Sequence, residues 1–286
     1  MPLLPHTDRG ALRLANARLS WGQRTYLMGI VNVTPDSFSG DGHVETAQAV
    51  AVGMAAAQRG SDVIDIGGES TRPGYVRIDE RVEIARVVPV IAALRERLPD
   101  AVLSIDTYKP QVARAACAAG ADLINSVWGM DDALLEVAVD RGAPVVIMHN
   151  QLGTDYDGDV VDEVLRFLDE AAQRSVRRGL PRESVIVDPG VGFGKNPDQN
   201  IAVLRALPRI VALGFPTLLG ASRKSTIGKL TGREPGDRLF GTAATTALAV
   251  QAGIDMVRVH DVAQARDVLA VADAIVRDWR PSGWTE

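Results

Sequence analysis

Cysteine is almost absent from this sequence, since Cys117 is the only one among 286 residues. A single cysteine excludes an internal disulfide and any metal cluster built from several thiolates of one chain. Cys117 stands in the apolar stretch Ala-Arg-Ala-Ala-Cys-Ala-Ala-Gly, which has helical character. We therefore expect a small buried side chain without a chemical role.

Long apolar runs are missing too. No window comes near the roughly 20 uninterrupted apolar residues that a membrane-spanning helix needs. The first residues, Met-Pro-Leu-Leu-Pro-His-Thr-Asp-Arg, have neither the basic start nor the apolar core of a secretory signal. We expect a cytoplasmic protein that does not contact a membrane.

Positive charge is in short supply. Lys and Arg number 31 against 36 Asp and Glu, so the formal net charge is −5. The densest basic pair is Arg177-Arg178, which suits a solvated helix face better than a nucleic-acid patch. The chain is 46% hydrophobic and 23% charged, an ordinary composition for a folded globular protein that does not bind nucleic acid.

What the chain does contain is a strand-and-helix alternation repeated eight times. Short apolar runs alternate with longer Ala-rich stretches that have helical periodicity. The runs are Tyr26–Val33, Val63–Gly67, Val102–Asp106, Asp122–Asn125, Pro144–His149, Val185–Asp188, Thr217–Ala221 and Met256–His260. Helices are expected over Glu45–Arg59, Ile78–Arg97, Lys109–Ala119, Val160–Arg178, Asn200–Leu213 and Gly241–Ala252. Eight parallel strands with helices between them predict a (β/α)₈ TIM barrel, which is an α/β fold.

The competing arrangement, a doubly wound sheet, requires a Gly-rich dinucleotide turn after its first strand. Here the first strand runs into Asn-Val-Thr-Pro-Asp-Ser-Phe instead. Residues 11–22 alternate apolar and polar around a turn-prone centre, which predicts a short N-terminal β-hairpin that closes the bottom of the barrel. No linker or break in composition divides the chain, so residues 1–286 are predicted to form a single domain.

Polar residues gather at the carboxyl ends of the predicted strands, where barrels of this kind carry their active sites. Any one of them could be a helix cap or a turn residue. A polar end on nearly every strand of one face predicts an active site. The residues concerned are Asn32, Asp36, Phe38, Gly67–Gly74, Asp106, Asn125, Met148, His149, Asp188, Ser222–Ser225, Arg258 and His260.

The side chains at this end can be sorted by chemistry. Arg258 and His260 alternate on one strand and so face the same way, and with Arg72 they suit an anionic phosphate. Asn32 could give one oxygen ligand to Mg²⁺, which prefers few protein ligands together with phosphate oxygens. The remaining acceptors, Asp106, Asn125 and Asp188, suit a heterocycle edge rich in N–H groups. The chain has only four lysines, and two of them, Lys195 and Lys224, follow strands into the mouth.

With these residues in view, the sequence resembles the dihydropteroate synthase family over nearly its whole length. Six motifs in family order carry the resemblance. They are Gly29–Phe38, Asp65–Gly74, Ser104–Thr107, Asp188–Lys195, Gly220–Ser225 and Arg258–Val262.

The resemblance implies condensation of 6-hydroxymethyl-7,8-dihydropterin pyrophosphate with 4-aminobenzoate in folate biosynthesis, with Mg²⁺ as cofactor. It also implies a homodimer and a sulfonamide target. The implied pterin site is Asp106, Asn125, Met148, Asp188 and Lys224. The implied pyrophosphate site is Asn32, Arg72, Arg258 and His260, and Asn32 is also the implied metal ligand. The implied aminobenzoate site is Phe38, Thr71, Pro73, Phe193, Lys224 and Ser225.

The implied catalytic residues are Asp106, Lys224 and Arg72. In the family reaction pyrophosphate leaves before the amine attacks, so Asp106 is expected to stabilise the charge of a pterin cation. The aminobenzoate carboxylate is expected to meet Ser225 and the adjoining helix N-terminus.

Two other functions share the barrel and the pterin floor. One is a pterin-dependent methyltransferase, which would lack the Ser-Thr-Arg-Pro-Gly and Ser-Arg-Lys-Ser motifs and work with a corrinoid partner. The other is a pterin-binding paralogue of low activity, since the sequence departs from the family pattern at Gly40–Asp41 and at Asn125–Ser126.

Overall fold

The computed structural model describes residues 9–14, 17–34, 42–70, 77–281 and 283–284, the side chains of 42–44 excepted. Its main element is an eight-stranded parallel sheet in the order β8-β7-β6-β5-β4-β3-β10-β9. Val187 of β8 bridges to Thr217 next to β9, so the sheet curls into a barrel. The strands are β3 (Tyr26–Asn32), β4 (Val63–Gly67), β5 (Val102–Asp106), β6 (Leu123–Ser126), β7 (Val145–Met148), β8 (Val185–Asp188), β9 (Leu218–Leu219) and β10 (Met256–Val259). The predicted TIM barrel is confirmed.

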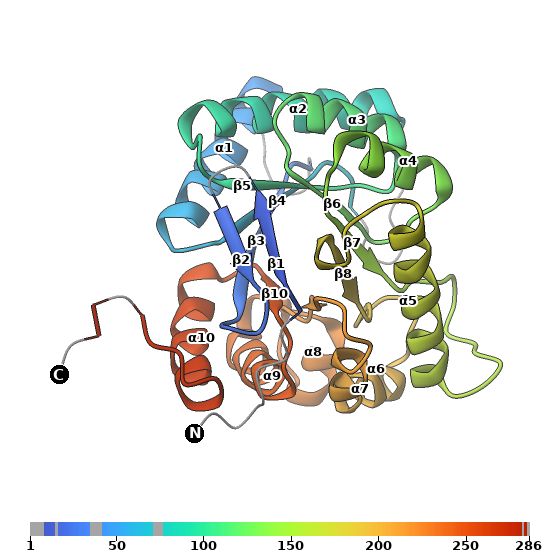
Figure 1. Cartoon of the computed structure of the whole chain (residues 1–286). Helices are drawn as coiled ribbons and strands as arrows, with labels where there is room; N and C mark the ends of the chain where they lie inside the picture. Colours follow the sequence, from blue (N-terminus) through green and yellow to red (C-terminus); the bar gives the residue numbers. More distant parts are fainter. Residues whose placement is uncertain (1–8, 15–16, 35–41, 71–76, 282, 285–286) are drawn as a thin grey trace.

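Helices surround the barrel, as Figure 1 shows. Side chains of Asp79, Asp131 and Asp159 cap the first turns of α2, α4 and α5, which explains where those helices begin. The bounds are α1 (Gly42–Gln58), α2 (Glu80–Arg97), α3 (Pro110–Ala118), α4 (Asp132–Arg141), α5 (Val160–Arg177), α6 (Pro197–Arg205), α7 (Leu207–Val211), α8 (Ser225–Thr231), α9 (Leu239–Ala252) and α10 (Val262–Val276), with 3₁₀ turns at Arg182–Ser184 and Pro235–Asp237.

Two details differ from the sequence predictions. The helix expected over Asn200–Leu213 is divided at Ala206 into α6 and α7, where Pro208 cannot donate an intrahelical hydrogen bond. Cys117 lies on α3 as expected, but it is only partly buried. No helix among the described residues is long and apolar enough to cross a membrane.

The predicted N-terminal hairpin is confirmed. Strands β1 (Ala11–Leu14) and β2 (Ala17–Ser20) pair antiparallel. Leu12, Leu19 and Trp21 pack against the inward side chains of the barrel, including Met28. The hairpin thus closes one end of the barrel, and Figure 1 views the molecule from that end. The site must lie at the opposite, open end.

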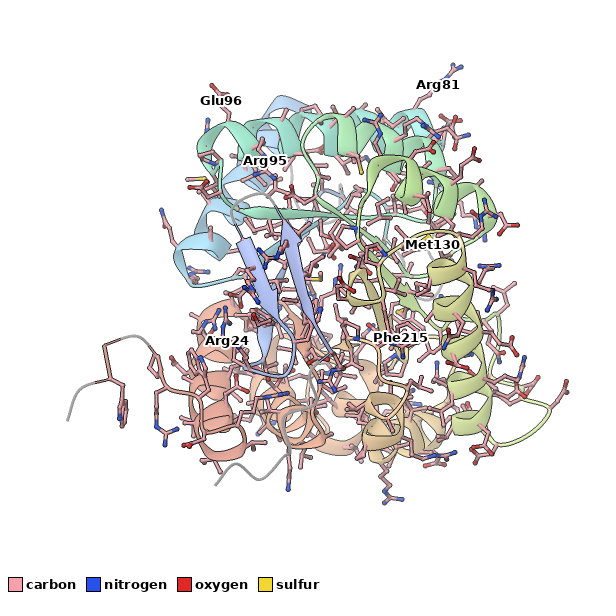
Figure 2. All side chains as sticks on the ribbon, in the orientation of Figure 1. Arg24, Arg81, Arg95, Glu96, Met130 and Phe215 are labelled. Atoms are coloured by element: carbon pink, nitrogen blue, oxygen red, sulfur yellow. The ribbon has the colours of Figure 1, made fainter. Side chains whose placement is uncertain are left out.

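Alternation along the strands divides the barrel into layers. Val63 belongs to the apolar layer beside the hairpin, and Asp65 and Gly67 follow on the same inward face because side chains alternate along a strand. The intervening residues, such as Ile64 and Ile66, face the helices and form the main core. Figure 2 shows Phe215 inside the molecule and Glu96 pointing outward from α2. The interior is therefore apolar at the bottom and polar at the mouth.

Candidate active site

An arginine held between two carboxylates lies under the mouth of the barrel. Arg258 on β10 donates from Nε to Asp65 Oδ2 at 2.6 Å and from a terminal nitrogen to Asp106 Oδ2 at 2.7 Å. The Asp65 side chain is fully buried, and that of Asp106 is 10% exposed. Asn125 also donates to Asp65 Oδ2, at 3.0 Å. Four side chains from β4, β5, β6 and β10 form one polar network.

The network leaves acceptors open. Asp65 Oδ1 and Asp106 Oδ1 are buried and accept no hydrogen bond from any described residue. A buried carboxylate oxygen without a partner is costly, so such an atom marks a place where a ligand can complete the set. Asp106 is the nearer of the two to solvent. The structure therefore offers its free oxygen to a hydrogen-bond donor on a bound molecule.

Asp188 supplies a second acceptor at the mouth. Its Oδ1 accepts from the backbone N–H of Gly190 at 2.7 Å. A Cβ placed on Gly220 would lie 3.6 Å from Asp188 Oδ2 and 4.0 Å from Arg258 Cβ. The glycine thus leaves room between these two groups, because a side chain there would fill that space. The open part of Asp188 can receive donors from a flat ligand in the barrel.

Lys224 connects this floor to an aromatic side chain. Its Nζ lies 3.7 Å from the centre of the Phe193 ring, which is a cation–π contact. The aliphatic part of Lys224 lies over Gly192, where an added Cβ would be 2.7 Å from Lys224 Cδ. Loop 190–195, which follows β8, and the loop between β9 and α8 therefore meet at Lys224.

Burial shifts the pKa values of these groups toward 7. It raises the pKa of Asp106 against the opposing charge of Arg258, and it raises the pKa of Asp188 to about 6 against the Gly190 hydrogen bond. Burial, with the charge of Arg258, lowers the pKa of Lys224 to about 7. Acids and bases whose titrations converge in this way are typical of active sites.

His260 and Arg258 differ in their charge. Burial and the charge of Arg258 lower its pKa to about 4, so the ring is neutral at pH 7. Ser222 Oγ accepts from the His260 backbone N–H at 3.3 Å and lies 3.1 Å from Nδ1. A neutral imidazole keeps one N–H donor and one acceptor nitrogen. His260 offers a neutral hydrogen bond, and Arg258 provides the charge.

The other expected residues divide into two groups. Asn32 ends β3 beside Gly67, Met148 is buried at the end of β7, and Ser225 begins α8 and is exposed. Asp36, Phe38, Thr71, Arg72 and Pro73 lie outside the described residues.

The two ends of the segment that carries Thr71, Arg72 and Pro73 are nevertheless held together. Glu69 accepts from the backbone N–H of Ile78 at 2.9 Å. Lys109 donates to Glu69 and Glu83, each at 2.6 Å. These side chains are nearly buried, so the ion pairs anchor both ends of the segment beside the mouth.

Sequence reasoning missed Asp65 and gave no role to Lys195. The signal for Asp65 was the alternation in Val63–Gly67, which places an acid on the inward face below the strand end. Conversely, the departure at Ser126 proves remote from the floor: Ser126 follows Asn125 on β6 and points to the opposite side of the strand.

A magnesium site fits the donors present only in an open form. Among the described side chains, no group of three His, Cys, Asp or Glu residues could hold a metal ion. Asn32 provides one hard oxygen at the mouth, and Mg²⁺ commonly takes one or two protein oxygens while phosphate and water complete its shell. The residues therefore fit a Mg²⁺ ion that arrives with a phosphate-bearing substrate.

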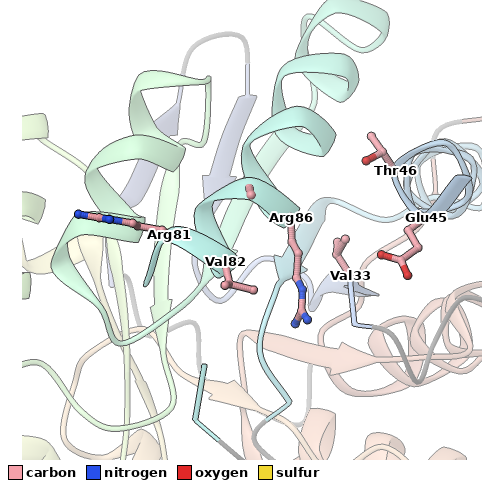
Figure 3. A pocket seen from close by; sticks show the side chains of 7 residues that line it. Val33, Glu45, Thr46, Arg81, Val82 and Arg86 are labelled. Atoms are coloured by element: carbon pink, nitrogen blue, oxygen red, sulfur yellow. The ribbon is translucent and has the colours of Figure 1, made fainter. Parts of the chain in front are cut away.

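A separate cavity of about 380 Å³ flanks the mouth. It opens between α1 and α2, and Figure 3 shows Glu45, Arg86 and Val33 around it. Arg86 donates to the Gly68 carbonyl at 2.8 Å, so this side chain is hydrogen-bonded to the residue that follows β4. None of the side chains predicted for the site lines this cavity.

Comparisons with known proteins identify the family. The family model described as pterin binding enzyme matches residues 28–260. The dihydropteroate synthase of Synechocystis is 42% identical over 280 residues, which are 94% of this chain and 95% of the relative.

Solved structures give the same result. The Xanthomonas albilineans dihydropteroate synthase with 4-aminobenzoic acid has a TM-score of 0.89 and 45% identity, covering 94% of this chain and 98% of that one. The same enzyme in complex with 7,8-dihydropteroate has a TM-score of 0.85 and 43% identity, covering 93% and 98%.

Proposed function

The chain belongs to the pterin-binding enzyme family as one of its dihydropteroate synthases, and we propose that the mouth of its barrel carries three adjoining subsites, for pterin, pyrophosphate and aminobenzoate. The observation that carries this division is the buried Asp65–Arg258–Asp106 network, which has a free carboxylate oxygen below the mouth. Lys224, whose charge acts on Asp106, contacts the Phe193 ring.

The pterin subsite is assigned to Asp106, Asp188, Asn125 and Lys224, with Met148 beside them. The amino-pyrimidinone edge of a pterin presents several N–H donors. Asp106 Oδ1 and the open part of Asp188 are acceptors that match such an edge, and hydrogen bonds to a carboxylate are stronger than neutral ones. Met148 is buried at the end of β7 and provides an apolar contact.

The pyrophosphate subsite is assigned to the other side of Arg258. Donors for anionic oxygens come from this guanidinium, from Arg72 and from the neutral ring of His260. Asn32 supplies the protein oxygen for Mg²⁺. When bound, Mg²⁺ would neutralise charge on the departing pyrophosphate. Arg258 contacts both carboxylates of the floor, so the pterin and pyrophosphate subsites share one residue.

The aminobenzoate subsite is assigned to Phe193, Lys224 and Ser225, with Phe38, Thr71 and Pro73 from the neighbouring segments. The Phe193 ring gives a flat apolar wall, and Lys224 and the Ser225 hydroxyl give donors for the carboxylate. Helix α8 has only seven residues, so the hydroxyl and the ammonium count for more than the helix dipole.

In the reaction, the bond between the pterin methylene carbon and the pyrophosphate oxygen breaks, and a bond from that carbon to the aminobenzoate nitrogen forms. Pyrophosphate leaves with the electron pair of the broken bond, and the attacking amine loses one proton. We assign Asp106 to stabilising the positive charge that develops on the pterin, because its Oδ1 has no partner within the protein and a charge at this position acts without covalent contact. Lys224 and Arg72 complete the proposed catalytic set.

A homodimer is the proposed assembly. Helix α9 contacts both α8 and α10, and the three helices expose apolar side chains: Phe240 is 86% exposed. Exposed apolar side chains gathered on neighbouring helices are typical of interaction surfaces. The others are Leu230, Leu248, Val271 and Ile275. Phe240→Glu should convert the dimer to a monomer in sedimentation velocity; a wild-type monomer at micromolar concentration would contradict the assembly.

The function is tested by pyrophosphate release from purified protein. Release should require the pterin pyrophosphate, aminobenzoate and Mg²⁺ together, and a sulfonamide should compete with aminobenzoate. Equal steady-state release without aminobenzoate would contradict a synthase. Methyl transfer from methyltetrahydrofolate to a corrinoid, without formation of dihydropteroate, would instead identify the methyltransferase. Pterin binding without any release would identify the inactive paralogue.

A further inference from the structure

Lys195 is a buried lysine whose ammonium contacts only uncharged groups. Its Nζ lies 2.9 Å from His149 Nδ1 and donates to the carbonyls of Gly190 and Phe193, each at 3.1 Å. Burial and the nearby lysine charge lower the pKa of His149 to about 3, so the ring is neutral and its Nδ1 can accept. Burial lowers the pKa of Lys195 itself to about 7, against the opposing charge of Asp188, so an ammonium is costly at this position. A methionine would fill the space without that cost, and the three polar contacts of Nζ therefore need another reason than packing.

The two carbonyls belong to one tight turn. Phe193 N–H donates to the Gly190 carbonyl at 3.1 Å, and Lys195 reaches back to both ends of that turn. Gly190 has φ +68° and Gly192 has φ +84°, values in the left-handed region. A Cβ on Gly190 would lie 1.9 Å from the His149 carbonyl oxygen, so the turn passes directly over the end of β7. The backbone has little room to move at this point.

Other side chains hold the outside of the same turn. Asn200 on α6 accepts from Gly192 N–H at 2.6 Å and donates to the Lys195 carbonyl at 3.1 Å. Tyr156 donates to the Gly194 carbonyl at 2.8 Å and stacks on His149. Of these three side chains, Lys195 alone donates to the carbonyls of Gly190 and Phe193, the two ends of the turn. It directly holds the carbonyl of Phe193, whose ring contacts Lys224.

From this geometry we propose that Lys195 is a positioning residue for the aminobenzoate subsite, which it serves by fixing the Gly190–Phe193 turn so that the Phe193 ring is held against Lys224. The inference rests on the proposed function, because it takes Phe193 and Lys224 as the walls of that subsite. Lys195 makes no hydrogen bond to a side chain assigned to the pterin or pyrophosphate, although its charge lowers the pKa of Asp188 and of Lys224. With kinetics measured at pH 8, above the pKa of Asp188, its removal should therefore affect aminobenzoate more than pterin pyrophosphate.

The test uses Lys195→Met in the full-length enzyme, with Lys229→Met as the matched control at an exposed position of α8. Steady-state kinetics are measured with aminobenzoate varied at saturating pterin pyrophosphate and Mg²⁺, and then with the substrates exchanged. Lys195→Met should raise the KM for aminobenzoate about tenfold and change the KM for pterin pyrophosphate less than twofold. Lys229→Met should change neither.

A double-mutant cycle with Phe193→Ala separates a positioning role from a general structural one. If Lys195 acts through Phe193, adding Lys195→Met to Phe193→Ala should raise the aminobenzoate KM less than twofold further. The inference would be overturned if the two substitutions raised the aminobenzoate KM independently, so that the double variant showed the product of the two single effects. It would also be overturned if Lys195→Met raised both KM values equally or left the aminobenzoate KM unchanged. Should the methionine variant not fold, the same cycle is run with Lys195→Gln, which keeps an N–H donor.

Failure of the proposed subsite has its own signature. Phe193→Ala alone should raise the aminobenzoate KM. If it does not, the subsite is misplaced, whatever Lys195→Met does. If it does and the lysine variant behaves as wild type, the subsite stands and the role of Lys195 is wrong.

Discussion

Arg258→Met should be less stable than the wild type by about 3–5 kcal/mol and should lose nearly all turnover. Removing one partner of a buried ion pair leaves the remaining charge uncompensated, and that is the usual cost. Here two carboxylates lose their cation, since Arg258 binds Asp65 and Asp106 at 2.6 and 2.7 Å. Urea unfolding followed by circular dichroism measures the stability, and pyrophosphate release measures the turnover.

The double variant Arg258→Met with Asp65→Asn is the matched control. It replaces the fully buried carboxylate by a neutral amide and should recover a large part of the lost stability. Turnover should not recover, because the guanidinium that we propose for the pyrophosphate is still missing. A double variant no more stable than Arg258→Met would contradict the proposed cause.

The pH dependence of this loss has a definite sign. Arg258 lowers the pKa of Asp106, so its removal raises that pKa further above the unfolded value of about 3.9. A carboxyl group whose pKa is raised by folding stabilises the fold at low pH and loses that contribution as pH rises through its folded pKa. The stability deficit of Arg258→Met should therefore be larger at pH 8 than at pH 5. An equal deficit at both would exclude this explanation.

Asp188→Asn should weaken pterin binding about 10- to 150-fold, corresponding to about 1.5–3 kcal/mol for a charged hydrogen bond. The asparagine oxygen can keep the Gly190 N–H bond, so the fold should survive. Its amide nitrogen would then face the N–H donors of the pterin, and two donors cannot pair. Calorimetry with 6-hydroxymethylpterin measures the affinity, and Asp198→Asn on the exposed start of α6 is the control.

The same variant removes a pH dependence. Burial raises the pKa of Asp188 to about 6, so wild-type affinity should fall as the pH drops through that value and the carboxylate takes up a proton. The asparagine variant cannot titrate and should lack this component. Retained affinity in Asp188→Asn, or an identical pH profile, would remove Asp188 from the pterin subsite.

Much of the candidate site could be predicted because the order of the strands along the chain determines which residues reach the open end of the barrel. Each strand ends at the same rim, so Asp106, Asn125, Asp188 and Arg258 could be assigned to one mouth from their positions alone. The sequence could not show that Arg258 spans Asp65 and Asp106. Those residues lie far apart in sequence, and only the closing of the barrel brings them within hydrogen-bond distance.

Charge states were equally out of reach of sequence reasoning. The sequence grouped His260 with Arg258 as residues suited to an anionic phosphate, but it could not show that burial and the charge of Arg258 lower the pKa of His260 to about 4. Lys195 could be placed at the mouth but not given a role, because its contacts are backbone carbonyls and a histidine from another strand. Desolvation depends on the whole surrounding structure, and no local pattern of residues reports it.

The sequence by itself determined the barrel, the hairpin at its bottom, the rim that carries the site and the family of the reaction. These follow from local rules, since strand and helix periodicity and motif order are written along the chain. The tertiary structure alone decided which acids share Arg258, which carboxylate oxygens stay open, and which side chains titrate near neutrality. Those properties arise from distances across the barrel and from the exclusion of water, which exist only once the strands have closed.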